Sequence, residues 1–323
     1  MSSTESRPLG IAALLLATAG WGGMFLVSKS VLHQVDPVWF TLLRYSLSAL
    51  FFVALLLPRG AAPWRRLRAQ ALPLALRGVA GFGVFSVLLL AGLAHSVPSH
   101  GAVIIATTPM TTQLLRWALD GVRPARSALL TAALALAGVA VVSGLLASGA
   151  GGGTTTLFGD ALTLLGTLGW VAYTRGAARF AALDVLEYTA LTVLASWPLL
   201  LLGALLATAF GLASLPSAEG LSASWHALLY VGLVSSAISV LAFNHGVRAL
   251  GAFTATAFLN FVPVSALLMS AALGKPPSAA ELVGTAMVVA ALLIHTLASA
   301  SGYVPLRRAI PARSNPNACG AAP

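Results

Sequence analysis

Ten apolar runs, each about as long as a bilayer core is thick, divide this chain, and short polar or Gly/Pro breaks separate them. A helix needs about 20 apolar residues to cross the hydrocarbon core. The runs lack the alternation of barrel strands, so helices are the remaining way to satisfy the backbone in lipid. We expect an all-α membrane protein with ten transmembrane helices, at approximately Gly10–Val31, Val38–Leu57, Leu74–Ala94, Ser99–Leu119, Ala128–Ala147, Gly159–Phe180, Leu186–Ala209, His226–Val247, Gly251–Leu273 and Ala280–Ala300.

The charge content agrees with this interpretation. Lys, Arg, Asp and Glu make up 8% of the 323 residues, and hydrophobic residues make up 58%. Soluble domains carry about 25% charged residues, so this chain cannot cover the surface of a water-soluble globular enzyme. Its hydrophobicity also excludes a disordered chain. The single cysteine, Cys319, allows neither an internal disulfide nor a cysteine metal cluster, and we expect no metal and no cofactor.

The basic residues indicate the orientation of the chain. With the N-terminus in the cytoplasm, 15 of the 18 basic residues fall on the inner side, the bias that orients membrane proteins. Lys29 and Lys275 fall outside, and Arg44 lies within the second span. The net charge of +10 is thereby explained without nucleic-acid binding, which we do not expect. Both termini are expected in the cytoplasm, and the first run is read as an uncleaved helix rather than a signal peptide.

A repeat relates the two halves of the chain. Thr-x-Gly-Trp occurs at 18–21 in the first span and at 167–170 in the sixth, an offset of 149 residues. Asp36 and Asp184 precede the second and seventh spans, and a proline lies inside both the fourth and the ninth. These matches keep one order and nearly one spacing. They indicate one five-helix repeat at residues 10–149, another at 158–300, and a flexible cytoplasmic tail at 301–323.

Five crossings are an odd number, so the second repeat enters the membrane from the side opposite to the first. The halves would then be inverted repeats about a pseudo-twofold axis in the membrane plane, an arrangement typical of secondary transporters. Their substrate site lies near the midplane where the halves meet. Aromatic and polar residues at that depth are therefore the candidate site residues, namely Trp21, Phe25, His100, Thr107, Thr108, Trp170, Tyr173 and Asn260.

Pro109 and Pro263 are the predicted helix breaks beside this site, because proline removes a hydrogen bond and bends a helix. Each candidate also has a structural reading. Threonines in membrane helices often serve as interhelical packing groups, and tryptophans at an interface are anchors. Arg44 could extend outward or attract a substrate carboxylate, and the sequence favours the structural role. His100 is the better candidate for a proton relay among the histidines.

Several kinds of chemistry are missing from the sequence. No phosphate-binding loop, no nucleophile elbow and no metal-ligand spacing occurs. Carboxylates are also absent from the expected midplane, which argues against an acidic proton carrier. We therefore expect a transporter rather than an enzyme. The alternatives are an intramembrane enzyme acting on lipid-linked substrates, and a membrane scaffold that transports nothing.

The chain resembles the EamA family of the drug/metabolite transporter superfamily over roughly residues 10–300. The resemblance rests on Trp21-Gly22-x-x-Phe25, Lys29, Asp36-Pro37 and Arg44 in the first half, and on the stretches 96–109, 249–263 and 281–284 later. One departure is that no arginine follows Asp184 as Arg44 follows Asp36, which puts a role for an arginine pair in doubt.

The resemblance implies a multi-pass protein of the bacterial inner membrane that moves small metabolites, such as amino acids or related compounds, often outward. The expected partners are a small-molecule substrate and the lipid bilayer. Coupling to protons and simple facilitated export both stay open, as do a monomer and a homodimer. The uncharged midplane favours a neutral, zwitterionic or partly aromatic substrate.

Overall fold

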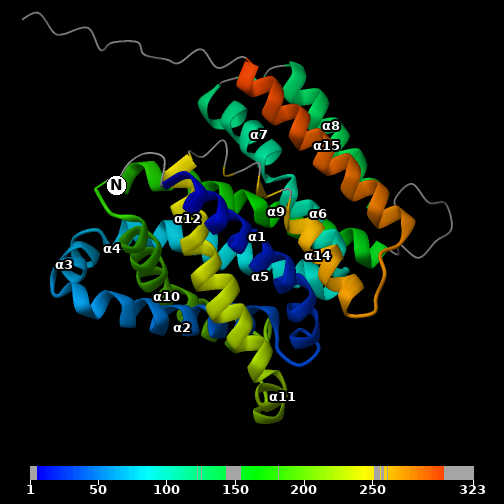
Figure 1. The fold of residues 1–323 in the computed structure, drawn as a ribbon. Coiled ribbons are helices and arrows are strands. Elements are labelled where there is room, and N and C mark those ends of the chain that lie inside the picture. The colour runs from blue at the N-terminus through cyan, green and yellow to red at the C-terminus, as the bar shows by residue number, and fades with distance from the viewer. Residues whose placement is uncertain are drawn as a thin grey trace, which may run out of the picture.

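The computed structural model describes residues 6–121, 123–124, 126–142, 154–180, 182–250, 255, 258–259 and 261–301. Within these ranges the regular structure is helical and contains no strand, which confirms the all-α prediction (Figure 1). The helices of the first half are α1 Ser6–Val31, α2 Pro37–Leu56, η1 Leu57–Arg59, α3 Ala62–Ala69, α4 Ala71–Gly78, η2 Val79–Val84, α5 Phe85–His95, α6 Pro98–Ala106, α7 Thr108–Asp120 and α8 Arg126–Val142. Those of the second half are α9 Thr154–Gly176, η3 Ala177–Phe180, α10 Val185–Ala209, α11 Ala218–Leu229, η4 Tyr230–Ile238, α12 Ser239–Leu250, α14 Phe261–Ala272 and α15 Ala279–Ser301.

Among the described residues, five helical segments are long and apolar enough to cross a membrane. They are Arg7–Val31, Pro37–Arg59, Ala71–His95, Val185–Ala209 and Ala218–Leu250. Shorter apolar helices lie at Leu129–Val142, Phe261–Ala272 and Ala279–Ala291. The described helices overlap all ten predicted segments, but the count of ten transmembrane helices stays a prediction.

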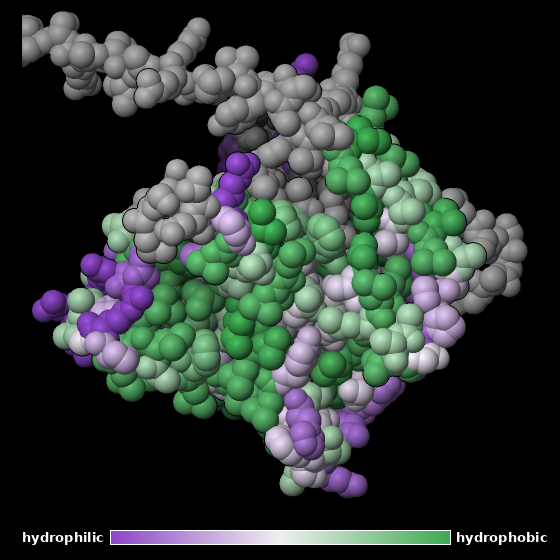
Figure 2. Space-filling view, viewed as in Figure 1, coloured by the Kyte–Doolittle hydropathy of each residue, from purple (hydrophilic) through white to green (hydrophobic). Residues whose placement is uncertain are grey.

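The surface is apolar where lipid would cover it. Leu50, Leu130, Leu202 and Leu268 are all more than half exposed, whereas many serines and threonines are buried inside the bundle. Figure 2 shows hydrophobic residues over most of one face, with hydrophilic residues gathered over α3 and at the tip of α11. A soluble protein would place these groups the other way round, since exposed apolar patches of that size mark contact with another apolar phase.

Helices of each half pack against helices of the other half. α1 packs along α12 and α9 packs along α5, while α2 contacts η4 and α10 contacts α4. α8 and α15 form another pair of contacting helices. Figure 1 shows α8 beside α15 and α1 beside α12. The first helix of each half therefore packs along the third helix of the other half.

The first helices of the halves run in opposite directions. Lys29 Nζ, near the end of α1, donates hydrogen bonds to the carbonyls of Leu93 and Ser96 at 2.7 and 2.6 Å, so α1 and α5 finish at the same end of the molecule. Gly159, near the start of α9, packs against Gly92 near the end of α5. α9 therefore begins at the end of the molecule where α1 finishes.

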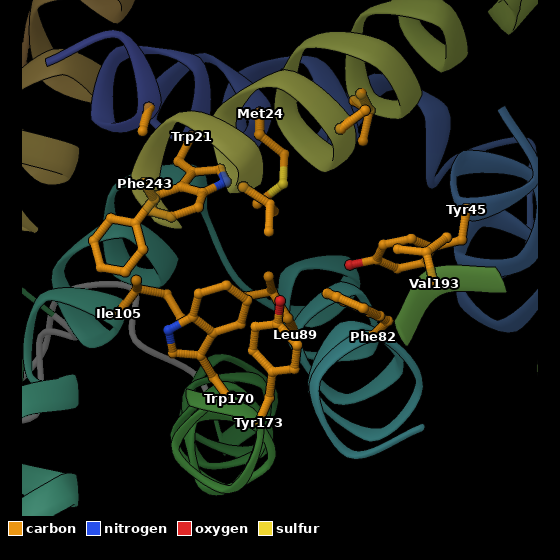
Figure 3. Close-up of a cluster of buried hydrophobic side chains, with 14 of the residues drawn as sticks. Trp21, Met24, Tyr45, Phe82, Leu89, Ile105, Trp170, Tyr173, Val193 and Phe243 are labelled. Atoms are coloured by element: carbon orange, nitrogen blue, oxygen red, sulfur yellow. The ribbon is translucent and has the colours of Figure 1, made fainter. Parts of the chain in front are cut away.

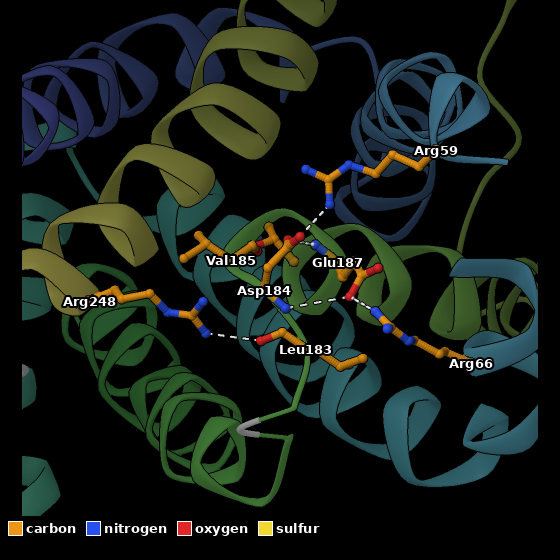
Figure 4. Close-up of polar contacts among 8 residues, drawn as sticks. Arg59, Arg66, Leu183, Asp184, Val185, Glu187 and Arg248 are labelled. Atoms are coloured by element: carbon orange, nitrogen blue, oxygen red, sulfur yellow. Dashed lines mark hydrogen bonds and ion pairs between the residues drawn. The ribbon is translucent and has the colours of Figure 1, made fainter. Parts of the chain in front are cut away.

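Ion pairs tie the halves together at the opposite end, where α1 begins (Figure 4). Arg59, at the end of η1, pairs with Asp184, and Arg66 on α3 pairs with the buried Glu187 of α10. Asp184 also caps α10 by accepting from the Glu187 backbone N–H at 2.8 Å. Arg248 of α12 donates to a carbonyl of the loop before α10. Side chains from three elements, η1, α3 and α12, thus converge on the start of α10.

The close approach of α9 to α5 predicts a glycine that tolerates no side chain. A Cβ on Gly92 would overlap Thr163 Oγ1 and the carbonyl oxygen of Gly159, and the backbone atom cannot move aside independently. We expect Gly92→Ala to lower the melting temperature of the purified protein in detergent, since overpacking costs about 1–3 kcal/mol.

Gly203→Ala is the matched control for that experiment. Gly203 lies within α10, in its last third, with nothing within 4 Å of the added Cβ. The same substitution should therefore leave the melting temperature unchanged or raise it, since alanine is favoured over glycine in a helix by up to about 1 kcal/mol. Equal melting temperatures for Gly92→Ala and the wild type would contradict the packing described for α5 and α9.

Candidate functional site

A central cavity lies where helices of both halves meet. Its walls come from α1, α2, α5, α6, α9, α12 and the residues before α14, and they are Trp21, Met24, Phe25, Arg44, Tyr45, Phe85, Leu89, Ile105, Trp170, Val240 and Leu259. The space that solvent can occupy inside is about 30 Å³, room for only two or three water molecules at ~10–15 Å³ each. A metabolite is therefore accommodated only when the lining side chains move apart.

Aromatic rings cluster at the cavity wall and directly behind it (Figure 3). The indoles of Trp21 and Trp170 meet edge to face with their centroids 5.8 Å apart, and Phe243 packs 5.2 Å from Trp21. Phe85 and Tyr173 lie 5.4 and 5.3 Å from Trp170. Such rings offer flat apolar faces and a partial negative charge toward a ligand, so they can bind aromatic groups or cations.

Two π-helical turns contact side chains of the cavity wall, η2 in the third helix of the first half and η4 in the third helix of the second. π-helical turns are rare, and they occur often at functional sites because they interrupt the regular hydrogen-bond ladder. Phe82 of η2 packs on Tyr45 and Tyr173 at 5.0 and 4.8 Å. The backbone carbonyl of Ser235 in η4 accepts the Trp21 indole N–H at 3.1 Å. That bond holds the Trp21 ring in its position at the wall.

Arg44 enters the same region from α2. It is 2% exposed, and its Nε donates to Ser236 Oγ of η4 at 2.7 Å. The guanidinium carbon lies 5.0 Å from the centre of the Tyr45 ring. A second bond between the same elements runs from Ser48 Oγ to the Gly232 carbonyl at 2.7 Å. The part of the cavity wall that the structure describes therefore has one arginine among apolar and aromatic side chains.

Of the predicted site residues, Trp21, Phe25 and Trp170 line the cavity. Phe25 is fully buried, and its ring fits against Gly101 of α6, where a Cβ would meet it. Tyr173 lies one layer behind Trp170, where its hydroxyl accepts a hydrogen bond from Asn244 at 3.3 Å. Tyr173 thus supports the wall from behind.

His100 lies away from the cavity, in a buried polar cluster near the end of α5. Its Nδ1 is 3.1 Å from Asp160 Oδ2 and 3.2 Å from Ser96 Oγ, and Ser96 also donates to Asp160. The cluster joins α6 of the first half to α9 of the second. Asp160, in the first turns of α9, is therefore a buried partner of His100.

Thr107 and Thr108 mark the break between α6 and α7. Pro109 has no N–H to pair with the carbonyl of Ile105, and Thr108 Oγ1 donates to that carbonyl instead. Thr107 Oγ1 does the same for Ile104 at 2.7 Å. Both hydroxyls are thus engaged in the break itself and lie outside the cavity walls.

The second predicted break also falls near a helix start. Pro263 is buried in the first turn of α14, which begins at Phe261, where a proline is tolerated because the first N–H groups have no helical partner. Asn260 lies outside the described residues.

Sequence reasoning missed part of the wall, namely Met24, Tyr45, Phe85, Leu89, Ile105, Val240 and Leu259. Nearly all of these side chains are apolar, and the same residue types also face lipid along the spans, so residue type alone does not separate a cavity face from a lipid face. The apolar runs from which the spans were predicted also gave no indication of the two π-helical turns.

The geometry agrees with comparisons to known proteins. The sequence matches the EamA-like transporter family over residues 8–144 and 157–297. A crystal structure of a protein with 22% sequence identity has the same fold, with a TM-score of 0.66, covering 93% of this chain and 99% of its own.

Three curated relatives are similar along most of their length. "Uncharacterized transporter YrdR" of Bacillus subtilis (strain 168) is 29% identical, covering 90% of this chain and 91% of its own. "Probable terminal-alkyne amino-acid exporter" of Streptantibioticus cattleyicolor is 30% identical, covering 87% and 91%. "Uncharacterized inner membrane transporter YedA" of Escherichia coli (strain K12) is 26% identical, covering 86% and 87%. This chain, a helical membrane protein with matches in both halves, belongs to the EamA-like transporter family.

Proposed function

We propose that this protein is a secondary transporter that exports small metabolites, such as amino acids or related compounds, across the bacterial inner membrane by alternating access. The observation that carries the proposal is the central cavity, whose walls come from both halves of the chain. A relative named as an amino-acid exporter supports the substrate class, and one named as an inner membrane transporter supports the location.

We also propose that the halves are inverted five-helix repeats, at 10–149 and 158–300, with a cytoplasmic tail at 301–323. The reciprocal packing of α1 on α12 and of α9 on α5 supports this relation. The opposite directions of α1 and α9 support the inversion, and the matched π-helical turns η2 and η4 support the repeat. Two such halves can rock about the cavity and open it to either side in turn.

The two ends of the molecule differ in charge. Arg59, Arg66 and Arg248 gather where α1 begins, and Lys29 lies at the other end. We propose that the end with the three arginines faces the cytoplasm, so that both termini lie inside. The ion pairs to Asp184 and Glu187 would then join the halves on the cytoplasmic side of the cavity and separate when it opens inward.

The alternatives have less support. An intramembrane enzyme needs a catalytic acid, base or metal set, and no group of three metal-binding side chains occurs in the described ranges. A scaffold would not need an arginine and two tryptophans around a central cavity. The relatives named above are transporters, and we propose that this protein is not an enzyme.

Trp170 provides the test of the cavity. We expect Trp170→Ala to lower the efflux of radiolabelled amino acids from proteoliposomes by tenfold or more, because a contact worth about 1.4 kcal/mol corresponds to a factor of ten. The readout is initial flux per folded protein, with folding checked by gel filtration.

Trp117→Ala is the matched control, since Trp117 of α7 is 46% exposed and lies outside the cavity. It should leave flux near the wild-type value. Wild-type flux in Trp170→Ala would remove Trp170 from the substrate site, and a wild-type protein that moves no amino acid or related compound would oppose the proposed function itself.

We further propose that export is coupled to protons through the His100–Asp160 pair. Both side chains are buried, and the pair joins α6 to α9 across the boundary between the halves. A change in the proton occupancy of the pair would therefore change a contact that has to rearrange when the halves move. Among the described residues, the titratable and charged groups around this end of α6 are Lys29, His33, His95, Asp160, Lys275 and Glu281.

His100→Gln keeps a hydrogen-bonding side chain but cannot gain a proton. We expect wild-type efflux to rise when the proton concentration is higher on the side that receives the substrate, and His100→Gln to transport without that dependence. The measurement is flux with imposed pH gradients of either sign. A gradient dependence that persists in both His100→Gln and Asp160→Asn would exclude the pair as the coupling site.

A further inference from the structure

Within the ranges that the structure describes, Arg44 is the one basic side chain in the wall of the central cavity. It is 2% exposed, and it lies inside an apolar span, Pro37–Arg59. An ionisable group at such depth is costly to keep charged and usually marks a functional site, with a partner of opposite charge. The described part of the chain contains no ion pair that includes Arg44, so its charge has no countercharge there.

The protein uses only part of the guanidinium. Nε donates to Ser236 Oγ at 2.7 Å, and the plane lies near the Tyr45 ring. Nη1 is buried and has no hydrogen-bond partner among the described residues. A buried donor without a partner is rare in native proteins, and it calls for an explanation such as a ligand. Held by Nε from one side, the guanidinium keeps a free donor beside the cavity.

A purely structural role explains this arrangement poorly. Ser48 Oγ already joins α2 to η4 through the Gly232 carbonyl, so these two elements have a hydrogen bond that needs no buried charge. Ser236 Oγ has a second contact of its own, since it donates to the carbonyl of Val231 at 2.7 Å. Ser236 is therefore fixed by η4 and in turn fixes the orientation of Arg44.

We propose that Arg44 binds the carboxylate of the transported substrate. This inference rests on the proposed transport function and narrows its substrate class. A guanidinium presents its N–H groups in a planar fork that matches a carboxylate. The rest of the wall, with Trp21, Phe25 and Trp170, suits an apolar or aromatic body, and ring faces can hold an ammonium group where one is present. The substrates are thus carboxylic acids with an apolar side, amino acids among them.

Binding to the purified full-length protein tests the inference by itself. The probes are L-phenylalanine and 3-phenylpropionate, which carry a carboxylate, and L-phenylalaninamide and 2-phenylethylamine, which do not. Isothermal titration should show at least tenfold tighter binding of the first two by the wild type. Arg44→Gln should erase that preference, and Arg44→Lys should keep part of it because the charge stays but the fork is lost.

Arg65→Gln is the matched control, since Arg65 is exposed on α3 outside the cavity. It should keep the wild-type preference. If Arg44→Gln does not fold, the comparison of Arg44→Lys with the wild type decides the question. A preference that persists in Arg44→Gln, equal binding of acids and amides by the wild type, or no binding of any of the four probes would overturn the inference.

Flux of the same four probes from proteoliposomes separates this inference from the proposed function. Wild-type protein that binds the acids through Arg44 but moves none of them would oppose transport and leave the carboxylate site standing. Wild-type protein that moves the amide and the amine as fast as the acids would support transport and overturn the carboxylate site.

Discussion

The close packing of each first helix against the third helix of the other half is the constraint on which the rest of the structure depends. It places Gly92 against Gly159 at one crossing and Leu14 against Gly246 at the other. None of these three glycines has room for a larger side chain. Small residues at such crossings let backbones approach without a hydrophobic driving force, which lipid does not provide. The same crossings bring Trp21 and Trp170 to within 5.8 Å of each other.

The polar groups of the interior follow from the absence of water. Many buried serines and threonines donate to a carbonyl three or four residues earlier in their own helix, as Thr192 does to Tyr188. Other side chains reach between helices, and among these are the contacts of Trp21 and Arg44 with the π-helical turn η4 and of His100 with Asp160, which join the two halves. In a low-dielectric interior these contacts between halves are strong when made and expensive when broken. They are therefore suited to hold one conformation of a transporter until a ligand or a proton alters them.

The candidate site was predictable in part. Trp21 and Trp170 were found because one short pattern recurs near the middle of two spans, and both line the cavity. His100 was expected at the same site from its depth, yet it lies in the first turn of α6 and contacts Asp160 in a separate cluster. Arg44 was noticed but read as structural, since its missing countercharge is visible only when its neighbours are known.

The sequence by itself determined that the chain is helical and enters a membrane, because runs of that length and apolarity have no other way to satisfy their backbone in lipid, whatever their neighbours. It also determined the membership of both halves in one family. The tertiary structure decided which face of each helix borders the cavity, where the π-helical turns fall, and which partners Arg44 and Asp160 have. Those properties depend on contacts between residues more than 50 positions apart, such as Arg44 with Ser236 and His100 with Asp160, and no local pattern encodes them.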